Sequence, residues 1–380
     1  MITNEEKSWK YQLPFNNDVY RNVKHFSFLH TPAERKILDA QIEFYRHNFS
    51  IDQLLYSFSQ CEEGEIAHFK EVVYKRRKDI LYCPNFLQKY YYNIIKKQFK
   101  EHSEFLLEML SFAMKKRGNK NPMLPIYKLV LGDYYLPIKK QVKKYSKRDF
   151  VDTFDVKIMP NDYIKHAMNI LDGLSTDYLT HGIFGEFTCE NIDIYKHTGY
   201  GNCELKSAQF YPGKNDSFTI TTGNNTLKLE ELRHNIYANV YPGRAHFYNN
   251  VMYRNAKLLD LGATFLLNGW DTFVSWHTRP SAYTRNSKSL YGKICSYLVK
   301  GNYKKALKNL NVYLLATYNT NKARELMISI TQYPGLIESY MFGGLATELL
   351  IKNEFAASPA DLLKQYRKVN LGDFFALYKK

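Results

Sequence analysis

The sequence predicts a mainly α-helical protein with a small β element near its middle. Three observations carry this prediction. Apolar residues recur at helical spacing over much of the chain, capping patterns precede several of these stretches, and β-branched residues typical of a strand are found at Ser217–Thr222. With 380 residues, of which 45% are hydrophobic and 24% charged, the chain can bury a sizeable core.

The first helical signals lie in the N-terminal region. Thr31-Pro-Ala-Glu34 has the form of a capping box with proline at the first helical position, and apolar residues follow it at helical spacing. Ser50-Ile-Asp-Gln53 offers a second cap. Pro84 opens a long helical pattern that runs to Gly118, a residue type that favours a helix end.

The next stretch, Asn119–Phe150, is rich in proline, glycine and lysine, and we interpret it as a connection between two lobes. This interpretation divides the chain into a helical N-terminal lobe with its linker, residues 1–150, and a C-terminal lobe, residues 151–380. Further helical signals are found at Tyr163–Leu171, from Leu227 onward, and after the cap Ser358-Pro-Ala-Asp361.

The composition excludes several classes of protein. No apolar run is long enough to span a membrane, and the first ten residues lack the apolar core of a signal peptide, so we expect a cytoplasmic protein without membrane contact. Five scattered cysteines predict neither a disulfide scaffold nor a thiolate zinc site. The net charge of +16 is interpreted as solvated lysine-rich helix faces, and no nucleic-acid-binding signature accompanies it.

One segment, Glu230–Tyr248, contains more information than the rest. A helix must stop or kink at Pro242-Gly243, and a second helix is expected to begin near Arg244. Side chains on the two sides of such a kink can converge on one point. Asn268-Gly-Trp270 follows, and Tyr333-Pro-Gly comes later, near Tyr340 and Gly343-Gly344.

These three pieces, in this order and spacing, resemble a large bacterial family catalogued as domain of unknown function 885. Its members are predicted zinc peptidases, mostly helical and related to the gluzincins. The resemblance covers about residues 180–380 and implies a large two-lobed, peptidase-like scaffold with the β element beside a central cleft. The matched positions are structural ones: Pro242, Gly243, Gly269, Trp270, Pro334, Tyr340 and Gly343.

The zinc-binding residues of the family are not matched. Alignment on Pro242-Gly243 puts Ala238 where the metal-binding histidine belongs and Asn239 at the glutamate, with Arg244-Ala245 in place of two histidines. Asn268 replaces the glutamate before Gly-Trp. Zinc needs imidazole, thiolate or carboxylate ligands, which these residues do not offer. We therefore expect no metal at this site and no cofactor.

The resemblance implies that Arg244 points where the metal once neutralised a substrate oxygen, so we expect it to bind an anionic group. His246 is the candidate general acid or base, with the hydroxyls of Tyr241 and Tyr248 as donors to an oxyanion. Thr221 lies in a strand expected to be a peptide-binding edge. The other predicted ligand-binding residues are Asn239, Asn268, Trp270 and His277.

Three functional hypotheses follow. The first is a repurposed, metal-free enzyme that binds a peptide, amino-acid or amide-like ligand with an anionic group and catalyses an acid–base or group-transfer step in a bacterial biosynthetic pathway. The second is a pseudo-peptidase that binds its ligand without chemistry. The third is a zinc hydrolase with displaced ligands, taken from His234, His246 and either Glu230 or Glu231.

Two weaker alternatives remain open. Glu65–His68 and Glu231–His234 both have the Glu-x-x-His spacing that di-iron helical bundles use. A cysteine nucleophile is the other, with Cys189 or Cys203 beside His197 or His246.

Overall fold

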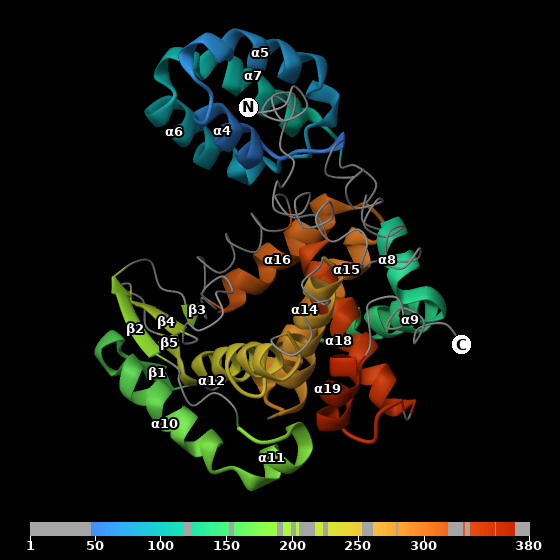
Figure 1. The fold of residues 1–380 in the computed structure, drawn as a ribbon. Helices are drawn as coiled ribbons and strands as arrows, with labels where there is room; N and C mark the ends of the chain where they lie inside the picture. The colour runs from blue at the N-terminus through green and yellow to red at the C-terminus, as the bar shows by residue number, and fades with distance from the viewer. Residues whose placement is uncertain are drawn as a thin grey trace, which may run out of the picture. The chain divides into compact units, whose positions relative to one another are not determined.

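A computed structural model describes residues 47–117, 124–151, 156–187, 193–198, 203–204, 217–222, 227–252, 261–278, 280–317, 330, 335–353 and 355–368 (Figure 1). The described chain is mainly helical, as the sequence predicts. None of the helices described there has the length and apolar character needed to span a bilayer. The expected cap at Thr31 and the matched Pro334 lie outside the described residues.

The chain divides into two compact units that interleave along the sequence. Unit 1 consists of Met1–Val130, Tyr297–Lys308 and Glu325–Leu336, and the rest of the chain forms unit 2. The sequence-based division at residue 150 and the two-lobed peptidase-like scaffold both stay predictions.

Four helices of unit 1 pack around one apolar core. Leu54, Phe58, Phe69, Tyr91 and Leu106 are among the buried residues that meet there. Each helix contributes one apolar stripe, which is why the helical spacing could be read from the sequence. The helices are α4 (Ile51–Ser59), α5 (Ile66–Lys75), α6 (Gln88–Gln98) and α7 (Ser103–Lys115).

The predicted cap of α4 is confirmed. The hydroxyl of Ser50 accepts a hydrogen bond from the Gln53 amide at 3.3 Å, and Gln53 Oε1 accepts one from the Ser50 amide at 2.8 Å. The long pattern that starts at Pro84 is divided into α6 and α7. The division comes at Phe99, whose ring packs edge-on against Phe58 at 5.7 Å between centroids.

The described residues of Asn119–Phe150, which we interpret as a connection between two lobes, are mostly helical. Two helices, α8 (Leu124–Leu131) and α9 (Tyr135–Ser146), occupy most of it. Pro125 and Pro137 fall in the first turn of these helices, where proline costs no intrahelical hydrogen bond. The prolines therefore mark helix starts instead of a break in structure.

Unit 2 contains the remaining helices and all the described strands. The helix predicted at Tyr163–Leu171 is confirmed as α10. The cap at Ser358 is also confirmed, because its hydroxyl accepts from the Asp361 amide at 3.1 Å. Besides α8 and α9, the helices that lie at least partly in unit 2 are α10 (Tyr163–Ser175), α11 (Tyr178–Phe184), α12 (Leu229–Asn239), α13 (Arg244–Phe247), α14 (Leu261–His277), α15 (Ala282–Leu298), α16 (Tyr303–Thr317), α18 (Leu336–Lys352) and α19 (Pro359–Lys368).

The predicted strand at Ser217–Thr222 is confirmed as β4, but its expected edge position is wrong. β4 lies between β2 (Asp193–Thr198), to which it is parallel, and β3 (Cys203–Glu204), to which it is antiparallel. The residue types of a segment predict that it forms a strand. They do not predict which strands lie beside it, because that depends on pairing with distant segments. A separate antiparallel pair joins β1 (Lys157–Ile158) and β5 (Leu227–Lys228).

Two packing contacts position the functional region of unit 2. Tyr163 and Ala167 on α10 share a buried cluster with Leu232 and Ile236 on α12, which holds these two helices side by side (Figure 1). The second contact joins α14 and α18 at Gly269, where an added Cβ would lie 2.6 Å from the backbone carbon of Gly343. Only glycine permits two helix backbones to approach this closely.

Candidate functional site

The predicted kink after α12 is confirmed. α12 ends at Asn239 and α13 begins at Arg244, with Pro242-Gly243 between them. The backbone folds so tightly that a Cβ on Gly243 would lie 2.0 Å from the carbonyl oxygen of Ala238. The turn directs the side chain of Arg244 toward α14.

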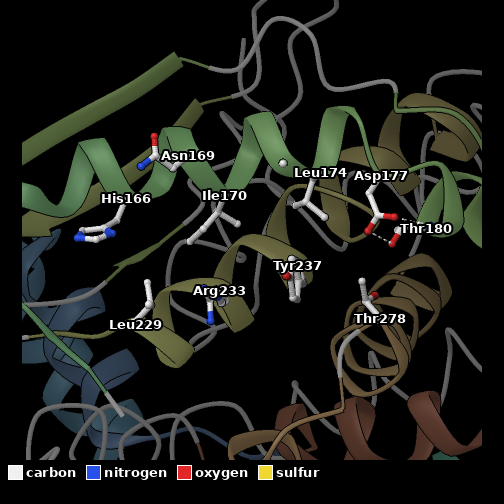
Figure 2. Close-up of a pocket in the computed structure, with 11 residues that line it drawn as sticks. His166, Asn169, Ile170, Leu174, Asp177, Thr180, Leu229, Arg233, Tyr237 and Thr278 are labelled. Carbon is white, nitrogen blue, oxygen red and sulfur yellow. Dashed lines mark hydrogen bonds between the residues drawn. The ribbon is translucent and has the colours of Figure 1, made fainter.

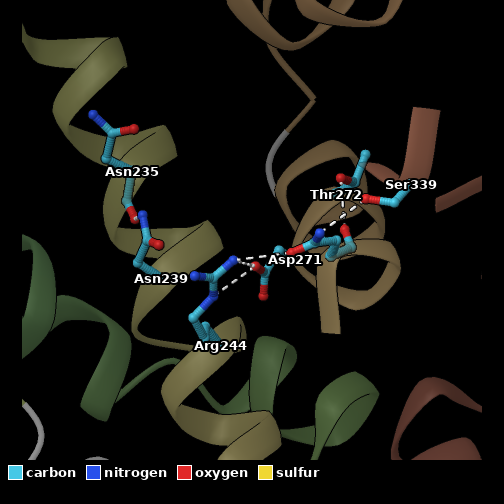
Figure 3. A network of polar contacts seen from close by, with 7 residues as sticks. Asn235, Asn239, Arg244, Asp271, Thr272 and Ser339 are labelled. Carbon is cyan, nitrogen blue, oxygen red and sulfur yellow. Dashed lines mark hydrogen bonds and ion pairs between the residues drawn. The ribbon is translucent and has the colours of Figure 1, made fainter. Parts of the chain in front are cut away.

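Arg244 forms an ion pair with Asp271 at the centre of a polar network (Figure 3). Its Nε and Nη2 donate to Asp271 Oδ2 at 2.9 and 2.6 Å, and Nη2 also donates to Asn268 Oδ1 at 3.3 Å. The amide nitrogen of Asn268 donates to Ser339 Oγ at 2.9 Å. The network therefore connects the kink through α14 to α18.

The ion pair is mostly withdrawn from water, because the side chains of Arg244 and Asp271 are 21% and 5% exposed. Burial raises the pKa of Asp271 to about 6, although the positive charge of Arg244 opposes this shift. Burial lowers the pKa of Arg244, but Asp271 and Tyr340 together outweigh it and the guanidinium stays protonated. The carboxylate of Asp271 thus neutralises the positive charge of Arg244, which the sequence analysis expected to bind an anionic ligand. Binding of an external anion by Arg244 stays a prediction.

His246 lies in the core beneath the kink and is 1% exposed. Its Nε2–H donates to the carbonyl of Phe184 at 3.1 Å, and Asn250 Nδ2 lies 3.1 Å from Nδ1, as a donor to an unprotonated nitrogen would. Burial lowers the pKa of His246 to about 4, so the ring is neutral at pH 7. Tyr241 is equally buried and donates its hydroxyl to the carbonyl of Gly185. These contacts are structural, and the geometry does not favour the predicted acid–base and oxyanion roles.

The burial of His246 should make the free energy of unfolding depend on pH. Its pKa is about 4 in the fold against about 6.5 in an unfolded chain, so the unfolded state binds more protons between these values. Stability from the neutral ring is complete above pH 6.5 and is lost as the pH falls through 4. Relative to His246→Gln, the wild type should lose about 3 kcal/mol of unfolding free energy over this range.

Urea unfolding at a series of pH values measures this difference. Asp271 has the opposite dependence, since its raised pKa stabilises the fold as the pH falls from 6 toward 4. Both proteins contain Asp271, so its contribution cancels in the comparison. Parallel curves for the two proteins would contradict the buried, neutral state of His246.

Three other predicted site residues lie close to the kink in different surroundings. Trp270 is fully buried and its Nε1 donates to the carbonyl of Pro242 at 2.7 Å, which fixes α14 to the kink. Asn239 donates to the carbonyl of Asn235 on its own helix, beside Arg244 (Figure 3). Tyr248 begins a π-helical turn, Tyr248–Met252, and is half-buried.

The last two predicted residues lie away from the network. Thr221 pairs with His197 in the register of β4 and β2, on the strand that is not an edge. His277 ends α14, nine residues beyond Asn268, or about 13 Å along a helix axis. It belongs to a separate cluster with Glu348. The structure therefore brings together Arg244, Asn239 and Asn268, and Trp270 is hydrogen-bonded to the kink beside them.

A pocket that the sequence did not predict lies between α10, the start of α11, α12 and the end of α14. Its volume is about 610 Å³. Figure 2 shows His166 and Leu229 toward one end, Asp177, Thr180 and Thr278 at the other, and Arg233 on the α12 side between them. The remaining lining residues are Asn169, Ile170, Gly173, Leu174 and Tyr237.

Helical spacing explains how two stripes line this pocket. Leu229, Arg233 and Tyr237 are four residues apart on α12, and residues 166, 169, 170, 173 and 174 share one face of α10. The sequence analysis did not select Arg233, which it treated only as part of a helical stretch. The sequence does not show that α10 and α12 face each other. Each stripe alone is an ordinary amphipathic pattern, so neither indicates a pocket.

Metal ligands do not gather in the described part of the chain. No group of three or more histidine, cysteine, aspartate or glutamate side chains there is arranged to hold a metal ion. In the relocated zinc set, His246 bonds to Phe184, while the His234 ring packs against Tyr283 at 4.9 Å between centroids. The cysteine alternatives fall on Cys189 and on side chains in β2 and β3, outside the side chains that the structure describes.

Comparison with protein-family models, curated proteins and solved structures finds no match to this chain. The resemblance to the zinc-peptidase family therefore stays a prediction from the sequence.

Proposed function

We propose that this protein binds an amino acid or a short peptide, without a metal, in the pocket between α10 and α12. The observation that carries the proposal is the opposition of a cationic side chain, Arg233, and an anionic one, Asp177, within one pocket. A ligand with a carboxylate and an ammonium group satisfies both. The volume, about 610 Å³, suits a small molecule.

The electrostatics of the two groups support this ligand class. Arg233 Nη1 donates to Glu230 at 2.5 Å, and the other N–H groups of a guanidinium remain donors for a ligand carboxylate. Asp177 caps α11 through hydrogen bonds from the Leu179 and Thr180 amides at 3.2 Å. The Thr180 hydroxyl also donates to it at 2.7 Å, and these bonds lower the pKa of Asp177. The carboxylate is therefore charged at neutral pH.

The burial of the residues around the kink does not favour catalysis there. His246 and Tyr241 have internal hydrogen-bond partners and almost no exposure, so neither meets a substrate in this conformation. The acid–base or transfer reaction that the sequence first suggested is the second candidate. It is favoured by the part of the Arg244 side chain that stays exposed, 21%. Consumption of the bound ligand by wild-type protein, lost in Arg244→Lys, would support it.

Thermal shift and calorimetry with amino acids and dipeptides test the proposal. A ligand that binds only the folded state raises the melting temperature. We expect N-acetylated and C-amidated forms of the best ligand to bind about tenfold more weakly or worse, because each loses one charge-assisted hydrogen bond. Arg233→Gln and Asp177→Asn should have the same effect, and asparagine keeps the cap of α11.

Glu230→Gln is the matched control. It removes the carboxylate that competes for Arg233, so binding should stay equal or become tighter. An absence of binding across the panel, or wild-type affinity in both charge variants, would refute the proposal.

A further inference from the structure

A separate cluster in unit 2 is centred on the half-buried Lys288. Its other members are Tyr145, Trp276, His277 and Glu348. Lys288 Nζ lies 4.8 Å from the ring centroid of Trp276 and 5.7 Å from that of Tyr145. The two rings come from α14 and α9, and the lysine from α15. Within the described residues the amine has aromatic contacts and no hydrogen-bond acceptor.

Charged and titratable groups face the amine from each neighbouring element. Glu348 on α18 has an Oε2 atom that is buried without a hydrogen-bond partner among the described residues. His277 Nε2 lies 4.0 Å from that atom. His277 Nδ1–H donates to the carbonyl of Phe273 at 2.7 Å, so a neutral ring carries its lone pair on Nε2. Arg148 lies over the other aromatic ring, 4.5 Å from the centroid of Tyr145.

These surroundings make the amine lose its proton more readily than an ordinary lysine. Burial lowers the pKa of Lys288, Arg148 acts in the same direction, and Glu348 opposes them. Burial and Lys288 lower the pKa of His277. Burial raises the pKa of Tyr145, which stays a phenol. A partly buried lysine beside a histidine and a carboxylate has the groups that attack on a carbonyl requires, namely a nucleophile and a proton donor.

We propose that Lys288 is the reactive amine of a second site, which forms an imine with a small anionic carbonyl compound of the 2-oxo acid class. The site is independent of the pocket between α10 and α12. Arg148 supplies the charge that binds the carboxylate of the compound, and its exposed position beside Tyr145 suits a ligand that arrives from solvent.

The reaction balances without an oxidant or reductant. The lone pair of Lys288 Nζ forms a bond with the carbonyl carbon, and a proton moves from nitrogen to the oxygen to give a carbinolamine. The C–O bond then breaks as the His277–Glu348 pair delivers a proton to the leaving hydroxyl. The lone pair on nitrogen completes the C=N bond, so the products are a protonated imine and one water molecule. The N–H proton of this imine returns to the His277–Glu348 pair, which restores the pair and leaves the neutral imine.

Reductive trapping tests the proposal on the full chain. Glyoxylate with cyanoborohydride converts an imine into a stable carboxymethyl group, which peptide mapping locates. We expect Lys288 to be labelled faster than any other lysine. Lys293 is the matched control, since it lies on the same helix with its Nζ 4.1 Å from the Phe150 centroid. Equal rates at Lys288 and Lys293 would overturn the proposal.

Two variants separate reactivity from structure. Lys288→Arg keeps a cation over Trp276 and should melt like the wild type, yet lose the fast label. Arg148→Gln should slow labelling of Lys288 by glyoxylate severalfold and leave labelling by glycolaldehyde, an uncharged carbonyl compound, unchanged. Equal slowing with both compounds, or with neither, would overturn the assignment of an anionic substrate.

Discussion

Replacing Arg244 with methionine is expected to destabilise the fold by about 3–5 kcal/mol, because the change leaves Asp271 as a buried charge without its partner. The side chain of Asp271 is 5% exposed, and its Oδ1 has no hydrogen-bond partner among the described residues. Arg233→Met on α12 is the control. Its ion pair with Glu230 is partly exposed, so its loss should cost at most about 1 kcal/mol. Urea unfolding of both variants gives the comparison.

Two further measurements show whether the charge of Asp271 causes the loss. In Arg244→Met, the cost should shrink as the pH falls from 7 toward 4, because a protonated Asp271 no longer needs a counter-charge. The double variant Arg244→Met with Asp271→Leu should recover most of the lost stability, since it replaces a buried ion pair by apolar groups. Equal losses in Arg244→Met and Arg233→Met would contradict the buried ion pair.

Local chemistry explains which parts of the fold the sequence could predict. Proline and glycine act on their own backbone, so Pro242-Gly243 predicted the kink, and Ser50 and Ser358 predicted their caps. The same residue types did not show where the next helices begin. Pro125 and Pro137 indicated only that no long helix could form, yet both stand in first helical turns, a position that depends on a boundary the pattern does not fix.

Pairing between distant segments explains what the sequence could not predict. Arg244 was selected for its charge, but its partner Asp271 lies 27 residues away and becomes a neighbour only when α14 packs against the kink. The edge position expected of Thr221 failed for the same reason, since β2 and β3 occupy both sides of β4. The pocket needs α10 opposite α12, and neither helix alone contains that information.

Gly243→Ala is the second change for which we expect a large effect, a loss of about 4 kcal/mol or more, or failure to fold. The new Cβ would lie 2.0 Å from the carbonyl oxygen of Ala238 and 2.4 Å from that of Tyr237. Both are backbone atoms in the last turn of α12, so they can move only if this turn unwinds. Thermal and urea unfolding measure the loss.

Gly182→Ala on α11 is the matched control. A Cβ added at Gly182 would meet no described atom within 4 Å, and alanine has the better helix propensity, so we expect a gain of about 0.5–1 kcal/mol. If Gly243→Ala unfolded with a loss as small as that of an exposed substitution, the backbone at the kink would differ from the one described.

The two large effects should not add. Gly243 immediately precedes Arg244, and unwinding α12 at this point moves the guanidinium away from Asp271. Gly243→Ala therefore already breaks the ion pair that Arg244→Met removes, and the double variant should lose less than the sum of the single losses. Gly269→Ala acts at the separate crossing of α14 with Gly343. Combined with Arg244→Met it gives the additive reference, provided that Asp271 keeps its place on α14. Full additivity of Gly243→Ala with Arg244→Met would mean that the kink and the ion pair are independent, and that the turn does not orient Arg244.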